Sequence, residues 1–180
     1  MILGMSVPTF TLLHVVISLI GIFAGLIVLF GMFKANLLNN WTALFLVTTV
    51  LTSVTGFFFH SVSFGPPHVL GILSLVVLAV AIPALYVYRL AGPWRWIYVA
   101  GAVVALYFNV FVGVVQAFQK LSFLQPLAPT QSEPPFFIAQ AAVLVTFIVL
   151  GIVAVRSFHP EQAPAFSEAA HARGDEVACE

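Results

Sequence analysis

The sequence predicts an all-α integral membrane protein, a bundle of five transmembrane helices. Of its 180 residues, 62% are hydrophobic and only 7% are charged, and the mean hydropathy is +1.12. A soluble globular chain carries about 25% charged residues, and a water-soluble fold could not bury this much apolar surface. Helices satisfy their own backbone polar groups, so a chain of this composition is stable as helices in lipid.

Five apolar runs have the length of a membrane span, which needs about 20 mostly apolar residues. The runs cover residues 9–33, 41–59, 69–88, 94–119 and 136–158. We do not expect the first run to be a signal peptide, because no Lys or Arg precedes it and it is too long for the apolar region of one. Both Met1 and Met5 are suited to the start of the chain.

Helix-breaking residues separate these runs. The breaks contain Asn36, Asn39 and Asn40, then Gly65-Pro66-Pro67, then Gly92-Pro93, and last a Pro-rich loop over residues 121–135. Pro67 is suited to the first turn of the third helix, and the short Gly92-Pro93 connection makes the third and fourth helices antiparallel neighbours. We therefore expect a five-helix transmembrane domain over residues 1–158 and a polar, disordered cytoplasmic tail over residues 159–180.

The basic residues predict the orientation. With five spans, one side of the membrane holds four of them, and only Lys120 lies near the other side; the four are Lys34, Arg89, Arg95 and Arg156. The positive-inside rule then places the N-terminus outside and the C-terminus in the cytoplasm of a bacterial inner (plasma) membrane. Trp94 and Trp96 flank Arg95, as expected for an aromatic belt at the inner interface.

Several polar side chains are expected near the outer ends of the spans and form a candidate polar site. They are His14, His60, His68, Asn109, Gln116, Lys120, Glu133 and Gln140. Ionisable and polar groups inside a membrane are costly, and they often mark functional sites. We predict that they converge on a pocket beneath the 121–135 loop, although Asn109 and Gln116 are also suited to hydrogen bonds between helices.

Other polar and small residues have a structural interpretation. Gly21 and Gly25 form a GxxxG pair that permits close approach of helices, and the Thr residues of the second run form a packing face. His60 and His68 are suited to a solvated interface, and His14 to a hydrogen bond between helices. Lys120 and Glu133 are suited to an ion pair that closes the outer loop.

The residue types allow several ligands. Two His residues on different helices can ligate a b-type haem, three can hold a metal ion, and a polar pocket with aromatic walls can hold a quinone headgroup. The single cysteine, Cys179, excludes an intramolecular disulfide and a Cys-based metal motif. There is no CxxCH, HExxH or Walker A motif, and the net charge of zero gives no indication of a nucleic-acid partner.

Four segments carry a resemblance to a known family. They are LAGPWRWIY at 90–98, LYFNVFV at 106–112, VQAFQK at 115–120 and LAPTQSEPPF at 127–136. These segments resemble a family of small bacterial inner-membrane proteins whose members are described only as hypothetical, and the resemblance covers about residues 6–160. It implies an inner-membrane protein and brings no established activity, cofactor or catalytic residue.

Three functions are compatible with the sequence. The first is a non-enzymatic accessory or small-ligand-binding membrane protein, which the absence of catalytic motifs favours. The second is a redox protein with haem or quinone near the periplasmic face, for which His14 and His68 are the evidence. The third is a small transporter, with a kink at Pro83 and a polar path along the fourth helix. The expected partners are the lipid bilayer and either other membrane subunits or further copies of the chain.

Overall fold

The computed structural model describes residues 4–59 and 66–160, and within them the chain is all-helical. The helices are α1 (Val7–Phe33), α2 (Asn39–Gly56), α3 (Pro66–Tyr86), α4 (Trp94–Lys120) and α5 (Pro134–Ser157), with a short 3-10 helix η1 (Gln125–Leu127). The prediction of an all-helical fold is confirmed, and each predicted run contains one helix whose ends differ by three residues at most. His60 and the predicted tail from residue 161 onward lie outside the described residues.

The helix ends follow local sequence signals. The hydroxyl of Ser6 accepts a hydrogen bond from the backbone N–H of Thr9 and caps α1. Helix α3 begins at Pro66 and α5 at Pro134, where the missing proline N–H leaves no helical hydrogen bond unmade. The Pro-rich loop before α5 forms no α-helix, and its only helical turn is η1.

Four of the helices are long and apolar enough to cross a membrane: α1, α3 from His68 onward, α4 and α5. Their outward faces carry large apolar side chains that are more than half exposed, among them Leu12, Phe23, Phe30, Ile138 and Val145. Apolar exposure on this scale is suited to lipid rather than to water. Helix α2 is not among the four; it has 18 residues and is rich in Thr and Ser.

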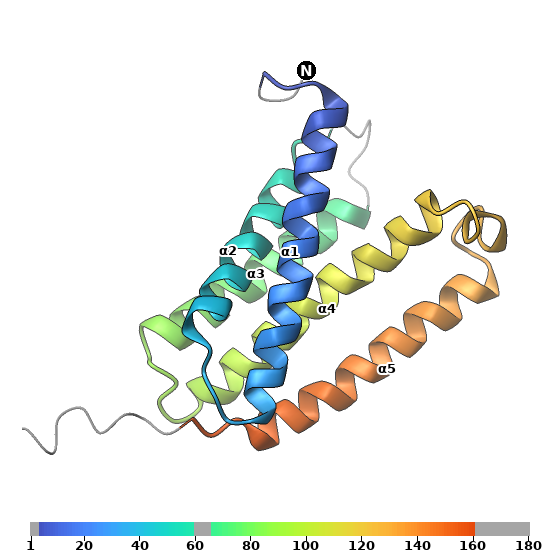
Figure 1. Cartoon of the computed structure of the whole chain (residues 1–180). Helices are drawn as coiled ribbons and strands as arrows, with labels where there is room; N and C mark the ends of the chain where they lie inside the picture. Colours follow the sequence, from blue (N-terminus) through green and yellow to red (C-terminus); the bar gives the residue numbers. More distant parts are fainter. Residues whose placement is uncertain (1–3, 60–65, 161–180) are drawn as a thin grey trace, which may run out of the picture.

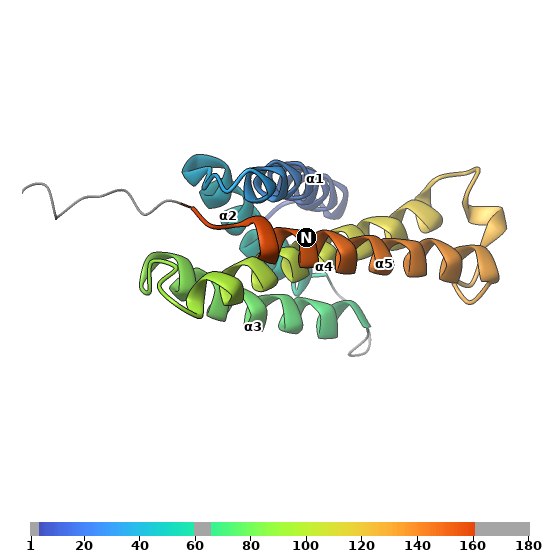
Figure 2. The ribbon, with the colours of Figure 1, turned by 90° about the horizontal axis from the view of Figure 1, so that it is seen from below.

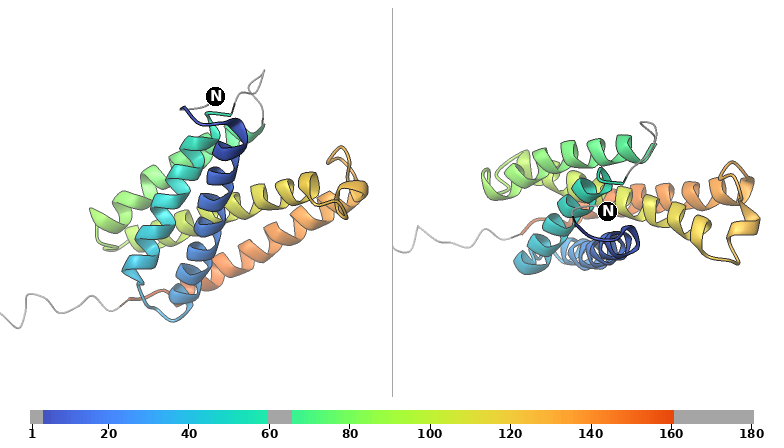
Figure 3. Two further views of the ribbon diagram at one scale, coloured as in Figure 1. Left: turned by 45° about the horizontal axis from the view of Figure 1, so that its top comes forward. Right: turned by 90° about the horizontal axis from the view of Figure 1, so that it is seen from above.

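Successive helices run in opposite directions, so the start of α1 and the end of α5 lie at opposite ends of the molecule (Figure 1). Helix α4 lies between the α1–α2 pair and α3 (Figure 2). The α4–α5 hairpin diverges from the other helices toward the loop that contains η1 (Figure 3). The bundle is therefore tightly packed at the end where α5 finishes and open at the other.

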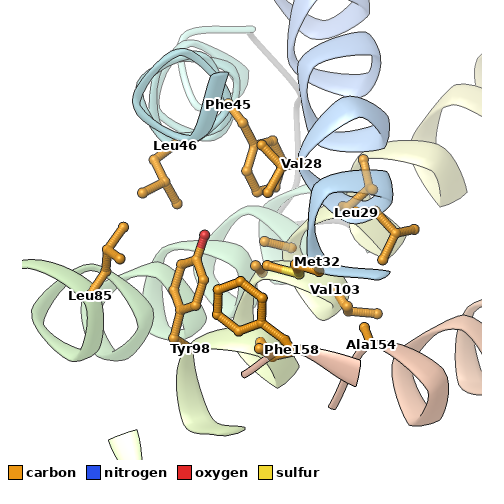
Figure 4. Packing of buried hydrophobic residues seen from close by; sticks show 14 of the residues in the cluster. Val28, Leu29, Met32, Phe45, Leu46, Leu85, Tyr98, Val103, Ala154 and Phe158 are labelled. Atoms are coloured by element: carbon orange, nitrogen blue, oxygen red, sulfur yellow. The ribbon is translucent and has the colours of Figure 1, made fainter. Parts of the chain in front are cut away.

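The main apolar core occupies the packed end and receives side chains from every helix (Figure 4). Tyr98 and Phe158 are fully buried there, with ring centroids 6.1 Å apart. The guanidinium of Arg95 donates a hydrogen bond of 2.9 Å to the carbonyl of Phe158. This bond ties the residue that follows α5 to the first turn of α4.

Close packing at Gly21 and Gly25 joins α1 to α2 and α4, as the GxxxG pattern predicts. A Cβ at Gly25 would lie 2.6 Å from Leu106 Cδ1 and 2.8 Å from Phe45 Cε2. A Cβ at Gly21 would lie 3.1 Å from the hydroxyl of Thr48. Only glycine at these positions permits the three helices to approach this closely.

We predict that Gly25→Ala destabilises the bundle, because its methyl group would overlap a leucine and a phenylalanine side chain. Overpacking of this kind costs about 1–3 kcal/mol. The measurement is the thermal unfolding midpoint in mild detergent. Gly113→Ala is the matched control, because the nearest atom to its Cβ is Ile22 Cδ1 at an ordinary 3.6 Å. Equal midpoints for the two variants would contradict the prediction.

Candidate functional site

The most polar part of the bundle interior is one side of α2 with the groups that it contacts. We call this set the α2 polar seam. It comprises Thr48, Thr49, Thr52, Ser53 and Thr55 on α2, His14 and Ser18 on α1, Ser74 on α3 and Asn109 on α4. It is built from hydrogen bonds between neighbouring helices and from hydroxyl groups that donate to the backbone carbonyl one turn earlier.

His14 connects α1 to the last turn of α2. Its Nδ1 lies 2.7 Å from the hydroxyl of Thr55, and that hydroxyl lies 2.6 Å from the carbonyl of Leu51, to which it donates. Because the Thr55 proton is used in that bond, we assign the proton of the shared contact to His14 Nδ1. The imidazole ring also meets Phe59 edge-on, with centroids 5.1 Å apart. The other ring nitrogen, Nε2, is then the acceptor atom of the ring.

Ser18 extends the same connection by one helical turn. Its hydroxyl donates to the carbonyl of His14 at 2.8 Å and lies 3.3 Å from the hydroxyl of Thr52 on α2. The α1–α2 contact therefore has two polar layers, one at His14 and one at Ser18, which precede Gly21 along α1. A hydroxyl group that donates to a backbone carbonyl of the preceding turn leaves no unpaired donor in lipid.

Asn109 connects α4 to the middle of α2. Its Nδ2 donates to the hydroxyl of Thr49 at 3.0 Å, and both side chains are buried. The same Nδ2 would lie 3.7 Å from a Cβ at Gly21, so α1 approaches this bond from the other side. The bond therefore sits where α1, α2 and α4 meet.

Ser53 connects α2 to α3. Its hydroxyl lies 2.9 Å from the carbonyl of Thr49 and 3.1 Å from the hydroxyl of Ser74, and both serines are buried. Helix α2 thus makes side-chain hydrogen bonds to each of its three neighbours. Sequence analysis singled out the Thr residues of α2 but not Ser74, because one serine in an apolar helix carries no signal of its partner.

The remaining polar groups belong to the α4–α5 hairpin. Gln140 is buried and donates from Nε2 to the carbonyl of Phe111 at 3.2 Å. Glu133 accepts hydrogen bonds within its own loop, from the backbone N–H and hydroxyl of Thr130 and from the N–H of Ser132. The Thr130 hydroxyl is the main cause that holds the pKa of the Glu133 carboxyl below its usual value.

The structure does not bring the predicted site residues together. His14 lies between α1 and α2, Asn109 lies at the α1–α2–α4 crossing, and Gln140 lies between α4 and α5. Gln116 and Lys120 are exposed on α4. The reason is geometric, because the α4–α5 hairpin diverges from α1 and α2 at the end where these residues lie (Figure 1). Among the described residues, His14, Asn109 and Gln116 do not share one pocket beneath the 121–135 loop.

The last two predicted site residues are His68 and His60. His68 lies in the first turn of α3, with its ring centroid 5.9 Å from that of Phe57. His60 lies outside the described residues. Among the residues that the structure describes, no group of three or more His, Cys, Asp or Glu side chains is arranged to hold a metal ion.

Comparisons with protein-family models, curated proteins and solved structures found no match to this chain.

We predict that the Asn109–Thr49 bond stabilises the bundle. Asn109→Leu and Thr49→Val each remove one partner, and a double-mutant cycle measures their coupling. The expected coupling is about 0.6 kcal/mol and no more than about 1.7 kcal/mol, as for other hydrogen bonds between membrane helices. Thr146→Val is the matched control, since the Thr146 hydroxyl bonds only to the carbonyl of Ala142 on its own helix. Zero coupling would show that this bond does not hold α2 and α4 together.

Proposed function

We propose that this chain is a non-enzymatic integral protein of a bacterial inner membrane, an accessory subunit or a small-ligand binder. The observation that carries the proposal is the use of the polar side chains inside the bundle. His14, Asn109 and Ser53 each bond to a neighbouring helix. Lipid supplies no hydrophobic force between helices, so such bonds act with close packing to hold a membrane bundle together. These hydrogen bonds therefore have a structural role.

The proposed topology has five spans, with α2 as the fifth. At about 1.5 Å per residue its 18 residues extend about 27 Å, close to the hydrocarbon thickness of about 30 Å. The hydroxyl groups of Thr48, Ser53 and Thr55 donate to carbonyls of α2 itself, and those of Thr49 and Thr52 accept hydrogen bonds from neighbouring helices, so lipid tolerates these groups. The alternating helix directions support this count, since they place α2 antiparallel to both α1 and α3 (Figure 1).

The proposed orientation places the packed end of the bundle in the cytoplasm. Lys34 follows α1, Arg89 follows α3, Arg95 begins α4 and Arg156 ends α5, all at that end. Lys120 ends α4 at the other. This distribution supports a cytoplasmic location for the end of α5.

We predict the activity of topology reporters from this orientation. A reporter active only in the periplasm should be silent when fused after Phe158 and active in the loop between α4 and α5. A third fusion, after Phe59, should be active, because α2 returns the chain to the outer side. A cytoplasm-specific fluorescent reporter at the same three positions is the control and should give the complementary result. A silent fusion after Phe59 would rule out either α2 as a span or the orientation.

A redox function is the second candidate, and the hydrogen bond of His14 favours it. Histidines that bind a metal or haem iron through one ring nitrogen usually donate a hydrogen bond from the other. The bond from Nδ1 to Thr55 has this character and leaves Nε2 for a ligand. Phe59 lies edge-on to the imidazole, and Phe10 packs against both Phe59 and Phe58.

An absorption spectrum distinguishes the two candidates. We predict that the full chain, purified in mild detergent from cells supplied with a haem precursor, has no Soret band. His14→Ala should then lower thermal stability, because the bond to Thr55 is lost. A Soret band that disappears in His14→Ala but persists in the exposed control His159→Ala would favour the redox function and contradict the proposal.

A further inference from the structure

A groove on the described surface runs between α4 and α5. It has a volume of about 410 Å³, and its lining is apolar except for Arg156 and the hydroxyl group of Tyr107. Val103 and Phe147 form its buried floor, while Val104 and Ile148 line it and are 37% and 52% exposed. A Cβ at Gly151 would lie 3.3 Å from Val103 Cγ1, so the two helices are in close contact beneath the groove. The groove is therefore a shallow apolar channel open to the lipid side of the hairpin.

The length of the groove matches one leaflet of a bilayer. Along α5 it extends from Leu144 to Arg156, which is about 18 Å at about 1.5 Å per residue. Half of a hydrocarbon core of about 30 Å is about 15 Å. A single acyl chain that enters at the Arg156 end therefore fits within the groove along its whole length.

The charge at its mouth is also suited to a lipid. Arg156 lies in the last turn of α5 and is exposed, and Arg95 lies close by because it bonds to the carbonyl of Phe158. Within the described part of the chain the only acidic side chain is Glu133, at the opposite end of α5. The described protein thus leaves the positive charge at this mouth uncompensated. Guanidinium groups bind phosphate with paired hydrogen bonds.

We propose that the α4–α5 groove binds one acyl chain of an anionic phospholipid and that Arg156 holds its phosphate headgroup. The acyl chain covers the apolar floor at Val103 and Phe147. The headgroup then lies at the interface where α5 ends. This inference needs only that α4 and α5 span the bilayer, and it does not depend on which side of the membrane Arg156 occupies.

Lipid retention by the full chain in detergent tests the proposal. The probe is an equimolar mixture of phosphatidylglycerol and phosphatidylcholine with the same acyl chains, and native mass spectrometry reads which lipid stays bound. We expect phosphatidylglycerol to be preferred about fivefold, the ratio that corresponds to about 1 kcal/mol for one basic residue. Arg156→Gln should remove the preference, and Arg156→Lys should keep most of it. Lys34→Gln is the matched control, a lost cation at the same end of the bundle but outside the groove.

A second pair of variants tests the groove itself. Val104→Trp fills the channel and should abolish retention of both lipids. Val149→Trp places the same bulk on a lipid-facing position of α5, 54% exposed and outside the groove, and should leave retention unchanged. Unchanged thermal midpoints show that both variants fold.

Three results would overturn the proposal. Equal binding of the two lipids by the unmodified chain would remove the role of charge. Retention of lipid by Val104→Trp at the level of Val149→Trp would place the lipid elsewhere. A dimer that Val104→Trp dissociates would show that a second copy of the chain, and not a lipid, occupies the groove.

Discussion

The rest of the structure depends on the crossing of α1, α2 and α4. Gly25 permits α1 to approach Phe45 on α2 and Leu106 on α4. One turn earlier on α1, Gly21 lies next to the hydrogen bond that joins Asn109 on α4 to Thr49 on α2. In lipid, apolar side chains gain little by leaving one apolar environment for another, so helices associate through close packing and hydrogen bonds. Both are concentrated at this crossing. The glycines set how close the helices lie, and the polar bond fixes their register.

The crossing also explains why a helix as polar as α2 is tolerated. Its hydroxyl groups face three neighbours, and His14, Ser74 and Asn109 provide a partner on each. Exposed to lipid, the same side chains would carry the cost of unsatisfied polar groups. The bundle thus places its least apolar helix where three neighbouring helices offer hydrogen-bond partners, while α5, which packs mainly against α4 and α1, presents apolar side chains outward.

A second consequence is the divergence of the α4–α5 hairpin. The first part of α4 packs against α1, α2 and α3, and its C-terminal part diverges from them toward the loop that contains η1 (Figure 1). A contact with α1 persists as far as Gly113, where a Cβ would lie 3.6 Å from Ile22 Cδ1. The last turns of α4 pack against α5 and the loop through a small apolar cluster around Phe118 and Phe136, and Gln140 on α5 donates to a backbone carbonyl of α4. This arrangement separates the outer polar residues from one another.

The sequence alone determined the helices and their ends, because apolar length, Pro and Gly act locally: Pro66 and Pro134 begin helices, and Ser6 caps one. It also determined the close contact at Gly21 and Gly25, since a spacing of four places both on one face. Only the tertiary structure decided which polar residues meet. Asn109 and Gln116 share a face of α4, yet one is buried against Thr49 and the other is exposed. Helical periodicity assigns a residue to a face, but the angle at which helices cross decides what lies opposite that face at each depth, and no local pattern encodes that angle.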